Sequence, residues 1–228
     1  MDVKIQTLKQ ISIFSALDEQ DIAGIASVTE IRSYKKNRVI FNQGDTGNVL
    51  FILISGLVKI FLTDKDGKEN ILKVIYEDDF FGEMSLLDGN FRSATIIALE
   101  NSKALLIYRE DLFKLIQSYP LIGYNMMVAL SRRLRATNND IASLNFLNSY
   151  GKVARVLLGF VTKRGKQESG NIVIDLPISR QEMAEMAGVS RETFSRILKK
   201  YKEMGCLKVK GKTIIITNQE ILKEKTIV

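Results

Sequence analysis

The stretch that organises the chain spans residues 120–148 and reads PLIGYNMMVALSRRLRATNNDIASLNFLN. Pro120 suits the first turn of a helix, because the N–H that proline lacks would have no helical partner there. Mainly apolar residues recur at alternating spacings of three and four, and they are Met127, Leu130, Leu134, Thr137, Ile141, Leu144 and Asn148. This seven-residue repeat predicts a helix with one apolar seam, typical of a coiled-coil pair.

Two arrangements fit such a seam: a helix packed on its own domain, and a helix paired with a second copy of the chain. The other faces of the helix favour pairing, because they are too polar to bury deeply; they carry Arg132, Arg133, Arg135, Asn138, Asn139 and Asp140. Thr137 interrupts the seam with a hydroxyl. A polar seam residue fixes the register of the pair, or contacts a ligand held beside the dimer interface.

The chain has 228 residues, enough for two domains that each bury a core. Charge divides unevenly: residues 1–148 carry 17 Lys/Arg against 18 Asp/Glu, and residues 149–228 carry 16 against 8. The net charges are therefore −1 and +8. A basic excess confined to the last third predicts a polyanion partner there, and nucleic acid is favoured over a membrane surface.

Cys206 is the only cysteine, and the sequence contains no histidine. This inventory excludes disulfides, Cys/His zinc sites, four-cysteine iron–sulfur clusters, histidine-ligated haem and catalytic triads that need histidine. Met1–Gln10 lacks the apolar core of a signal peptide, and the apolar run Val49–Val58 is well below the ~20 residues of a membrane helix. We therefore expect a cytoplasmic protein without a membrane segment, metal, haem or cluster.

Short runs of Val, Ile and Phe follow an N-terminal helix that Asp18 is predicted to cap, with Ile22, Ile25 and Ala26 on its inner side. The runs are Val39–Phe41, Val49–Ile54, Leu57–Thr63, Ile71–Tyr76, Ala94–Leu99 and Lys103–Tyr108. Glycines and the turn Asp64–Gly67 separate them. This spacing predicts a small antiparallel barrel or roll.

The segment with the most binding chemistry lies between two of these runs, and it reads FFGEMSLLDGNFRSAT over residues 80–95. Gly82 allows a close approach of the backbone to a ligand, and Met84 and Ser85 fall in a helical turn whose N–H groups suit an anion. Glu83 can accept hydrogen bonds from ribose hydroxyls, while Arg92 and Ser93 can hold a phosphate. Singly, these residues are more often a turn glycine, a surface ion pair and a strand-edge serine. Their joint order raises the odds of a phosphate site.

The last third contains a helix-turn-helix pattern. We expect a hinge at Asn148–Gly151, a helix over Lys152–Lys163 and a connecting loop over Lys163–Gly170. Ser179 with Glu182 forms a capping box, Gly188 ends the first helix, and Ser190 caps a second helix that runs to about Tyr201. Ala184, Gly188 and Phe194 have the spacing that the packing of two such helices requires.

The second helix presents one polar face, made of Arg191, Glu192, Ser195 and Arg196, which can reach base edges. A solvated surface helix is the alternative, and the +8 charge of this region argues against it. Lys208–Thr213 is predicted to form a hairpin wing with lysines near DNA phosphates. The expected DNA contacts are Ser179, Arg180, Ser190, Arg191, Glu192, Ser195, Arg196 and Lys210.

These motifs together resemble the cyclic AMP receptor and fumarate-nitrate regulator (Crp/Fnr) family over essentially the full length. The resemblance rests on the Gly82–Leu87 segment, on Arg92-Ser93-Ala94-Thr95, on Gly44 and Gly56, and on the helix-turn-helix. It implies an α+β protein with an antiparallel β-roll of the cyclic-nucleotide-binding type (1–120), a dimerisation helix and hinge (121–148) and a winged helix-turn-helix (149–228). The resemblance also implies no enzymatic activity.

The resemblance further implies a cyclic nucleotide effector, with cyclic AMP as the first candidate. Gly82 and Glu83 would meet the ribose, Arg92 and Ser93 the cyclic phosphate, and Thr137 and Asn138 the base. The family's cyclic AMP receptors carry Thr-Ser where this chain has Thr137-Asn138. Another effector, or none, is therefore the first alternative.

The implied target is double-stranded DNA with a palindromic site, bound by a homodimer. Arg191, Glu192 and Arg196 match the residues that read TGTGA in one branch of the family, and Glu192-x-x-Ser195-Arg196 also fits the pattern that reads TTGAT in the other. In the family a loop at about residues 163–170 can contact RNA polymerase, which is therefore an expected partner. The second alternative is a nucleotide-binding regulatory subunit whose basic domain docks on protein.

Overall fold

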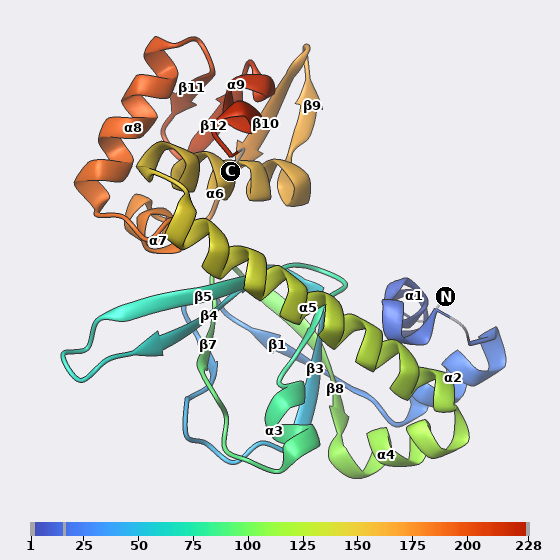
Figure 1. Ribbon diagram of the computed structural model, residues 1–228. Helices are drawn as coiled ribbons and strands as arrows, with labels where there is room; N and C mark the ends of the chain where they lie inside the picture. Colours follow the sequence, from blue (N-terminus) through green and yellow to red (C-terminus); the bar gives the residue numbers. More distant parts are fainter. Residues whose placement is uncertain (1–2, 16, 227–228) are drawn as a thin grey trace. The chain divides into compact units, whose positions relative to one another are not determined.

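The computed structural model describes residues 3–15 and 17–226, and the chain divides by its internal contacts into two units, Met1–Arg135 and Ala136–Val228. The first unit contains the predicted roll, built from two four-stranded antiparallel sheets (Figure 1). The first sheet has the strand order β1 (Glu30–Tyr34), β8 (Ser102–Tyr108), β3 (Val49–Ser55) and β6 (Phe80–Phe81). The second has the order β2 (Val39–Phe41), β7 (Thr95–Ala98), β4 (Val58–Thr63) and β5 (Glu69–Ile75).

Strand β3 shows why an unbroken apolar run forms the centre of the roll. Its alternate residues face two different cores: Leu50 and Ile52 pack with the helices, and Phe51 and Leu53 pack with the second sheet. All four side chains are buried. A strand covered on both faces loses the apolar and polar alternation that marks a half-exposed strand.

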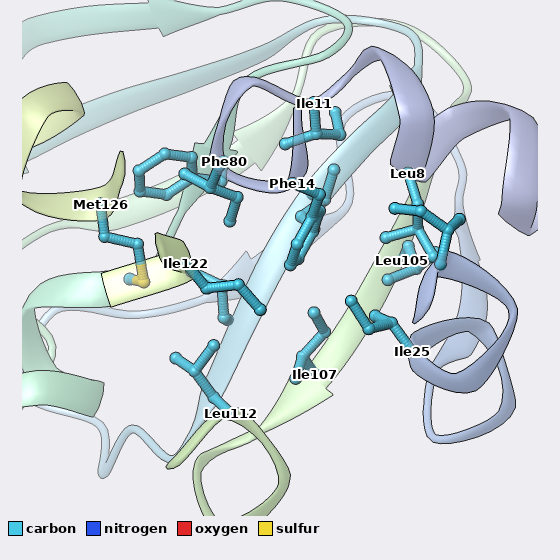
Figure 2. Packing of buried hydrophobic residues seen from close by; sticks show 14 of the residues in the cluster. Leu8, Ile11, Phe14, Ile25, Phe80, Leu105, Ile107, Leu112, Ile122 and Met126 are labelled. Atoms are coloured by element: carbon cyan, nitrogen blue, oxygen red, sulfur yellow. The ribbon is translucent and has the colours of Figure 1, made fainter. Parts of the chain in front are cut away.

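Helices cover one face of the first sheet, and their side chains pack with side chains of that sheet in the cluster that Figure 2 shows. These helices are α1 (Val3–Gln10), the short 3-10 helix η1 (Ser12–Phe14), α2 (Glu19–Ser27), α4 (Arg109–Ser118) and the start of α5 (Pro120–Phe146). Ile122 and Met126 of α5 are buried in this cluster beside Leu112 of α4. Burying an Ile, Leu or Met side chain contributes about 1.5–3 kcal/mol, so the start of α5 is held firmly in the first unit.

Beyond Met126 the long helix keeps the predicted apolar seam; Leu130 is half-buried, and the other apolar side chains of the seam are exposed. Met127 is 61% exposed, Leu134 64%, Ile141 54% and Leu144 44%. The helix ends at Phe146, before Asn148, so the last position assigned to the seam was wrong. Asn148 instead caps the next helix, because its side chain accepts a hydrogen bond from the Gly151 N–H at 3.0 Å.

The second unit is a winged helix-turn-helix. Its helices are α6 (Ser149–Arg164), α7 (Arg180–Met186), α8 (Arg191–Glu203) and α9 (Gln219–Glu224). Its antiparallel sheet has the order β11 (Leu207–Lys210), β12 (Thr213–Ile216), β10 (Asn171–Asp175) and β9 (Lys166–Glu168). The core of this unit lies between α6 and α8. Its buried side chains are Val153, Leu157, Phe160, Phe194, Leu198 and Tyr201.

Two sequence expectations in this unit are wrong. Ser149, Tyr150 and Gly151 are the first turn of α6 and not an irregular hinge, because Asn148 supplies the cap that starts the helix. Residues 163–170 are not a plain loop, because Lys166–Glu168 pairs with β10 as a strand. The turn of that hairpin contains Ser169 and Gly170, both with positive φ.

Candidate effector and DNA sites

The segment that carries the predicted phosphate site begins where β6 ends. Gly82 has φ +80°, a left-handed conformation that turns the chain from β6 into α3 (Glu83–Asp88). Leu86 of α3 is fully buried and anchors the short helix on the roll. Gly89, with φ +75°, ends it. The predicted single helical turn is therefore present, and it places Glu83 and Ser85 on its buried side.

Arg92 is the centre of this site. Its side chain is buried, with 5% exposed, and its guanidinium donates to Gly82 O at 2.7 Å, to Ser85 Oγ at 2.9 Å and to Val49 O at 3.0 Å. Its Nε is also buried and has no hydrogen-bond partner among the described residues. A buried donor without a partner costs about 1–3 kcal/mol, so the site keeps one donor ready for an acceptor.

Two aromatic rings lie near the same guanidinium, and two carboxylates act on its charge. Arg92 Cζ lies 4.2 Å from the centre of the Phe41 ring and 5.7 Å from that of Phe51. Burial lowers the pKa of Arg92 from its ordinary value, and the charges of Asp45 and Glu83 oppose that shift. Arginine stays protonated at neutral pH, so the site presents a fixed, partly desolvated positive charge.

Glycine at position 47 makes room for this arrangement. A Cβ on Gly47 would lie 2.5 Å from Arg92 Nε and 2.7 Å from Arg92 Cζ, and it would also strike Ser85 Oγ. No side chain larger than hydrogen fits while Arg92 keeps this position.

We therefore expect Gly47→Ala to push Arg92 out of its position. The crowding should cost about 1–3 kcal/mol and lower affinity for any ligand held by the guanidinium about 5- to 150-fold. Isothermal titration of the variant with its effector gives the change. Gly24→Ala is the matched control, because Gly24 lies in α2 with open space around it. Equal effector affinity in the two variants would show that Gly47 does not shape the site.

Glu83 is buried, with 7% exposed, and is paired with a residue of α5. Arg133 Nη1 donates to Glu83 Oε1 at 2.8 Å, and its Nη2 lies 2.5 Å from Asp79 Oδ1 and 2.5 Å from Phe80 O. Its guanidinium also covers the Phe80 ring at 4.0 Å. The long helix is thus joined by hydrogen bonds to the segment that contains the predicted phosphate site.

The predicted helix-turn-helix is formed by α7 and α8. The capping box of Ser179 and Glu182 is present, and Ser190 caps α8 by accepting from Thr193 N at 3.1 Å. Phe194, Ile197, Leu198 and Tyr201 are buried, whereas Arg191, Glu192, Ser195 and Arg196 are exposed. Gly188 has φ +61°, as the tight turn between the helices requires.

Two known domains match this chain. The cyclic nucleotide-binding domain matches residues 31–119, and the Crp-like helix-turn-helix domain matches residues 151–225. Together the two matches span more than half of the chain. The chain belongs to the Crp/Fnr family of transcriptional regulators.

Full-length relatives agree with this assignment. The cyclic AMP receptor protein of Thermus thermophilus is 34% identical over 95% of this chain and 97% of its own. The CRP-like cAMP-activated global transcriptional regulator of Mycobacterium tuberculosis is 31% identical over 96% of this chain and 98% of its own. Among solved structures, the c-di-GMP responsive global regulator CLP of Xanthomonas campestris has a TM-score of 0.75 and 29% identity, over 87% of this chain and 99% of its own.

As a Crp/Fnr family member, the protein is a transcriptional regulator and not an enzyme, with a cyclic nucleotide-binding domain and a DNA-binding helix-turn-helix. Within the described residues, no group of acidic, cysteine or histidine side chains has the arrangement of a metal site. No helix among those residues is long and apolar enough to span a membrane.

The structure of this family member brings some predicted ligand residues together and not others. Glu83, Ser85 and Arg92 meet around one centre. Ser93 is exposed at its edge, and its hydroxyl lies 3.6 Å from the sulfur of Met84, which is itself 55% exposed. Thr137 and Asn138 are exposed on α5 and belong to the second unit.

Several site residues were missed by the sequence reading. Arg133 was assigned only to a polar outer face, because nothing local shows that Glu83, fifty positions earlier, accepts from it. Gly47 was taken only as a glycine between two strands, and Phe41 only as the end of the strand Val39–Phe41. The sequence did contain a signal for Gly47, because a glycine beside a strand often marks a place where another group approaches the backbone closely.

The predicted DNA residues play two different parts in the structure. The hydroxyls of Ser179 and Ser190 are engaged in helix caps, and Arg180 is half-buried, with burial lowering its pKa. Glu192 is exposed, and its pKa is lowered by its own backbone N–H and by the Ser190 hydroxyl. Lys210 is exposed at the end of β11, beside the wing turn that includes Gly211.

Proposed function

We propose that the protein is a homodimeric, effector-gated regulator that binds a palindromic DNA site when a cyclic nucleotide occupies the roll. The observation that carries this proposal is Arg92, a buried guanidinium whose Nε has no acceptor among the described residues. An anionic ligand supplies such an acceptor.

Each remaining residue then has a chemical part in holding the effector. The cyclic phosphate accepts from Arg92 and from the Ser93 hydroxyl. The ribose hydroxyl donates to Glu83, and Gly82 lets the sugar approach the backbone. Met84 and Ser85 complete the wall, with Ser85 keeping Arg92 in place at 2.9 Å. Glu83 already accepts from Arg133, so a ribose bound here touches the network that includes α5.

The base is assigned to Thr137 and Asn138, and the homodimer to the exposed seam of α5. Leaving several large apolar side chains exposed along one helix is unfavourable for a monomer, and pairing with a second copy removes them from water. By function we divide the chain into 1–120 for sensing, 121–148 for dimerisation, and 149–228 for DNA binding. RNA polymerase remains the proposed partner of the β9–β10 hairpin.

Cyclic AMP is the first candidate effector, because two relatives at 31% and 34% identity are named for it. A relative named for c-di-GMP has the same fold, and Asn138 stands where the family's cyclic AMP receptors have serine. Calorimetric titration with cyclic AMP, cyclic GMP and c-di-GMP separates these effectors. Binding of none of them favours the alternative in which the roll answers another small molecule or none.

The DNA site is proposed to contain a TGTGA-like or TTGAT-like half-site repeated about one helical turn, ~34 Å, apart. Arginine suits the two acceptors of guanine and glutamate suits the amino group of cytosine, so Arg196 and Glu192 read the shared G·C pair. Arg191 favours a second guanine and Ser195 a thymine. We give TGTGA the preference, because an arginine discriminates more strongly than a serine.

Replacing Glu192 with alanine should relax selection at the shared base pair by roughly 1–3 kcal/mol. Lys210→Ala is the comparison variant, because Lys210 faces phosphates in the proposal; it should weaken all sequences alike and flatten the salt dependence of binding. Selection from random duplexes, with effector present, measures both. If the Glu192→Ala protein selects the same sequence as the wild-type protein, Glu192 does not read the shared G·C pair.

A further inference from the structure

Strand β5 carries a lysine on the inner face of the roll, and the predicted effector residues do not include it. Lys73 lies directly opposite Ile60 of β4, and two residues further on Ile75 lies opposite Val58. Ile75 and Val58 are buried in the cluster between the two sheets, and Ile60 packs against that cluster. Alternate residues of a strand face the same side, so the side chain of Lys73 projects from the inner face of the second sheet.

Lys73 lies beside the charged residues that connect α5 to the predicted phosphate site. Its Nζ is 3.7 Å from Asp79 Oδ2. The other oxygen of the same carboxylate accepts from Arg133, which also donates to Glu83. A ligand that reaches Glu83 therefore comes close to the ammonium group of Lys73.

The ammonium group of Lys73 is available to a ligand. At 3.7 Å its contact with Asp79 is an ion pair longer than a hydrogen bond, so its three N–H donors can turn to a closer acceptor. The side chain is 46% exposed, which leaves it accessible from solution. Partial burial still lowers the pKa of Lys73 from its ordinary value of 10.5, and the charges of Asp79 and Glu83 oppose that shift.

Glu83 lies between the two cations of the site. Its charge acts both on Arg92 and on Lys73. The other carboxylate that acts on Arg92 is Asp45, whereas Lys73 is paired with Asp79. The order Arg92, Glu83, Lys73 matches the order phosphate, ribose, base in a nucleotide. A nucleotide with its phosphate on Arg92 and its ribose on Glu83 therefore extends its base toward Lys73.

On the basis of the proposed effector function, we propose that Lys73 reads the base of the effector and selects guanine. Guanine carries two adjacent acceptors, O6 and N7, whereas adenine has an amino group in place of O6. Lysine offers donors only, so adenine in the same position directs its amino donor at another donor. The expected order is guanine before adenine, the reverse of the order that the names of the relatives suggest.

Charge balance favours a base over a second phosphate beside Lys73. Lys73 and Arg133 are the two cations of this network, and Asp79 and Glu83 are its two carboxylates. A second phosphate would add an anion next to those carboxylates, whereas a base carbonyl accepts from Lys73 without adding charge. Cyclic GMP and c-di-GMP both present a guanine, so both belong to the proposed class of effector.

Calorimetric titration of the full-length protein with cyclic GMP, cyclic IMP, cyclic AMP and c-di-GMP tests this assignment. Cyclic IMP isolates the contact, because its base has O6 and N7 but lacks the 2-amino group of guanine. We expect cyclic GMP and cyclic IMP to bind about tenfold more tightly than cyclic AMP, as for one charge-assisted hydrogen bond at a partly exposed site. If c-di-GMP alone binds, Lys73→Met should weaken it about tenfold for the same reason.

Lys73→Met removes the ammonium group and keeps most of the length of the side chain. We expect the ratio of cyclic IMP affinity to cyclic AMP affinity to fall from about ten in the wild-type protein to about one in this variant. Lys73→Arg keeps a cationic donor and should keep much of the preference. Lys65→Met is the matched control on the exposed β4–β5 turn, and it should leave the ratio unchanged.

Two results would overturn the assignment of the base to Lys73 and leave the proposed effector function in place. The first is equal affinity of the wild-type protein for cyclic IMP and cyclic AMP, when both bind. The second is a Lys73→Met protein with the wild-type preference, because Lys73 would then act only by positioning Asp79 and Arg133. Binding of none of the four nucleotides would overturn both the base assignment and the proposed effector function.

Discussion

Arg92→Gln should bind the effector about 30- to several-thousand-fold more weakly than the wild-type protein. The estimate corresponds to ~2–5 kcal/mol for removing one partner of a buried, hydrogen-bonded charge pair. The reason is local: the guanidinium is buried, and three of its hydrogen bonds fix it to Gly82, Ser85 and Val49. Calorimetric titration measures the loss.

Arg38→Gln is the matched control, since it removes an exposed guanidinium from the same domain and should leave effector affinity intact. Arg92→Gln leaves Gly82 O and Val49 O without their donor, so circular dichroism should first confirm that the variant folds. If it does not fold, Ser93→Ala replaces it, because Ser93 is exposed and its loss should weaken binding more mildly. If a folded Arg92→Gln protein binds the effector with full affinity, Arg92 does not hold the effector's phosphate.

Leu134→Asp should convert the proposed dimer into a monomer. Leu134 is 64% exposed in the single chain and lies in the middle of the seam, so in a parallel pair it would face its own copy. A charge without a partner in an apolar interface costs about 3–5 kcal/mol, and here the cost arises twice, once from each copy. Analytical ultracentrifugation gives the association state.

Asn139→Asp introduces the same charge on an exposed position of α5 that lies off the seam, and this variant should remain dimeric. DNA binding should fall together with dimerisation in Leu134→Asp, because a palindrome needs two reader helices at a fixed spacing. A Leu134→Asp protein that sediments as a dimer would show that the exposed seam serves another purpose.

The features that could be predicted from the sequence are those whose signals are local. The capping box of Ser179 and Glu182 and the Asp18 cap each involve residues three apart, and both are present. The six predicted strands match β2, β3, β4, β5, β7 and β8 within two residues at each end. These strands could be predicted because burial of one face gives an alternating pattern and burial of both faces gives a continuous apolar run.

Other features depended on partners far away in the sequence. Strand β1 was missed because Glu30–Tyr34 is exposed along nearly its whole length and therefore has no apolar pattern; its pairing with β8 defines it. The Glu83–Arg133 pair, the Gly47 contact with Arg92 and the β9–β10 hairpin likewise arise from tertiary packing. The break after Phe146 depends on the side chain of Asn148, which caps α6 and does not extend α5.

The phosphate-binding role of the site stays a prediction, and the structure shows which of its residues lie together. Gly82, Glu83, Ser85 and Arg92 do lie together, because a left-handed glycine and one helical turn bring them near the start of β7. The sequence order could not show that Arg92 is buried, or that its Nε has no partner among the described residues. Burial gives that guanidinium its strength, because a charge shielded from water interacts more strongly with a phosphate.

The alternative of a nucleotide-binding subunit that docks on protein has lost most of its support. Residues 151–225 match a Crp-like helix-turn-helix, and full-length relatives above 30% identity are transcriptional regulators.

In the proposed function, a cyclic nucleotide bound in the roll controls sequence-specific DNA binding. Fluorescence anisotropy tests it with a labelled TGTGA palindrome and a scrambled duplex of the same composition, each titrated at a fixed salt concentration with and without cyclic AMP, cyclic GMP or c-di-GMP. We expect one of these nucleotides to raise affinity for the palindrome about 5- to 150-fold while affinity for the scrambled duplex stays unchanged. Equal affinity for both duplexes, whichever nucleotide is present, would show that no tested cyclic nucleotide controls sequence-specific DNA binding by this protein.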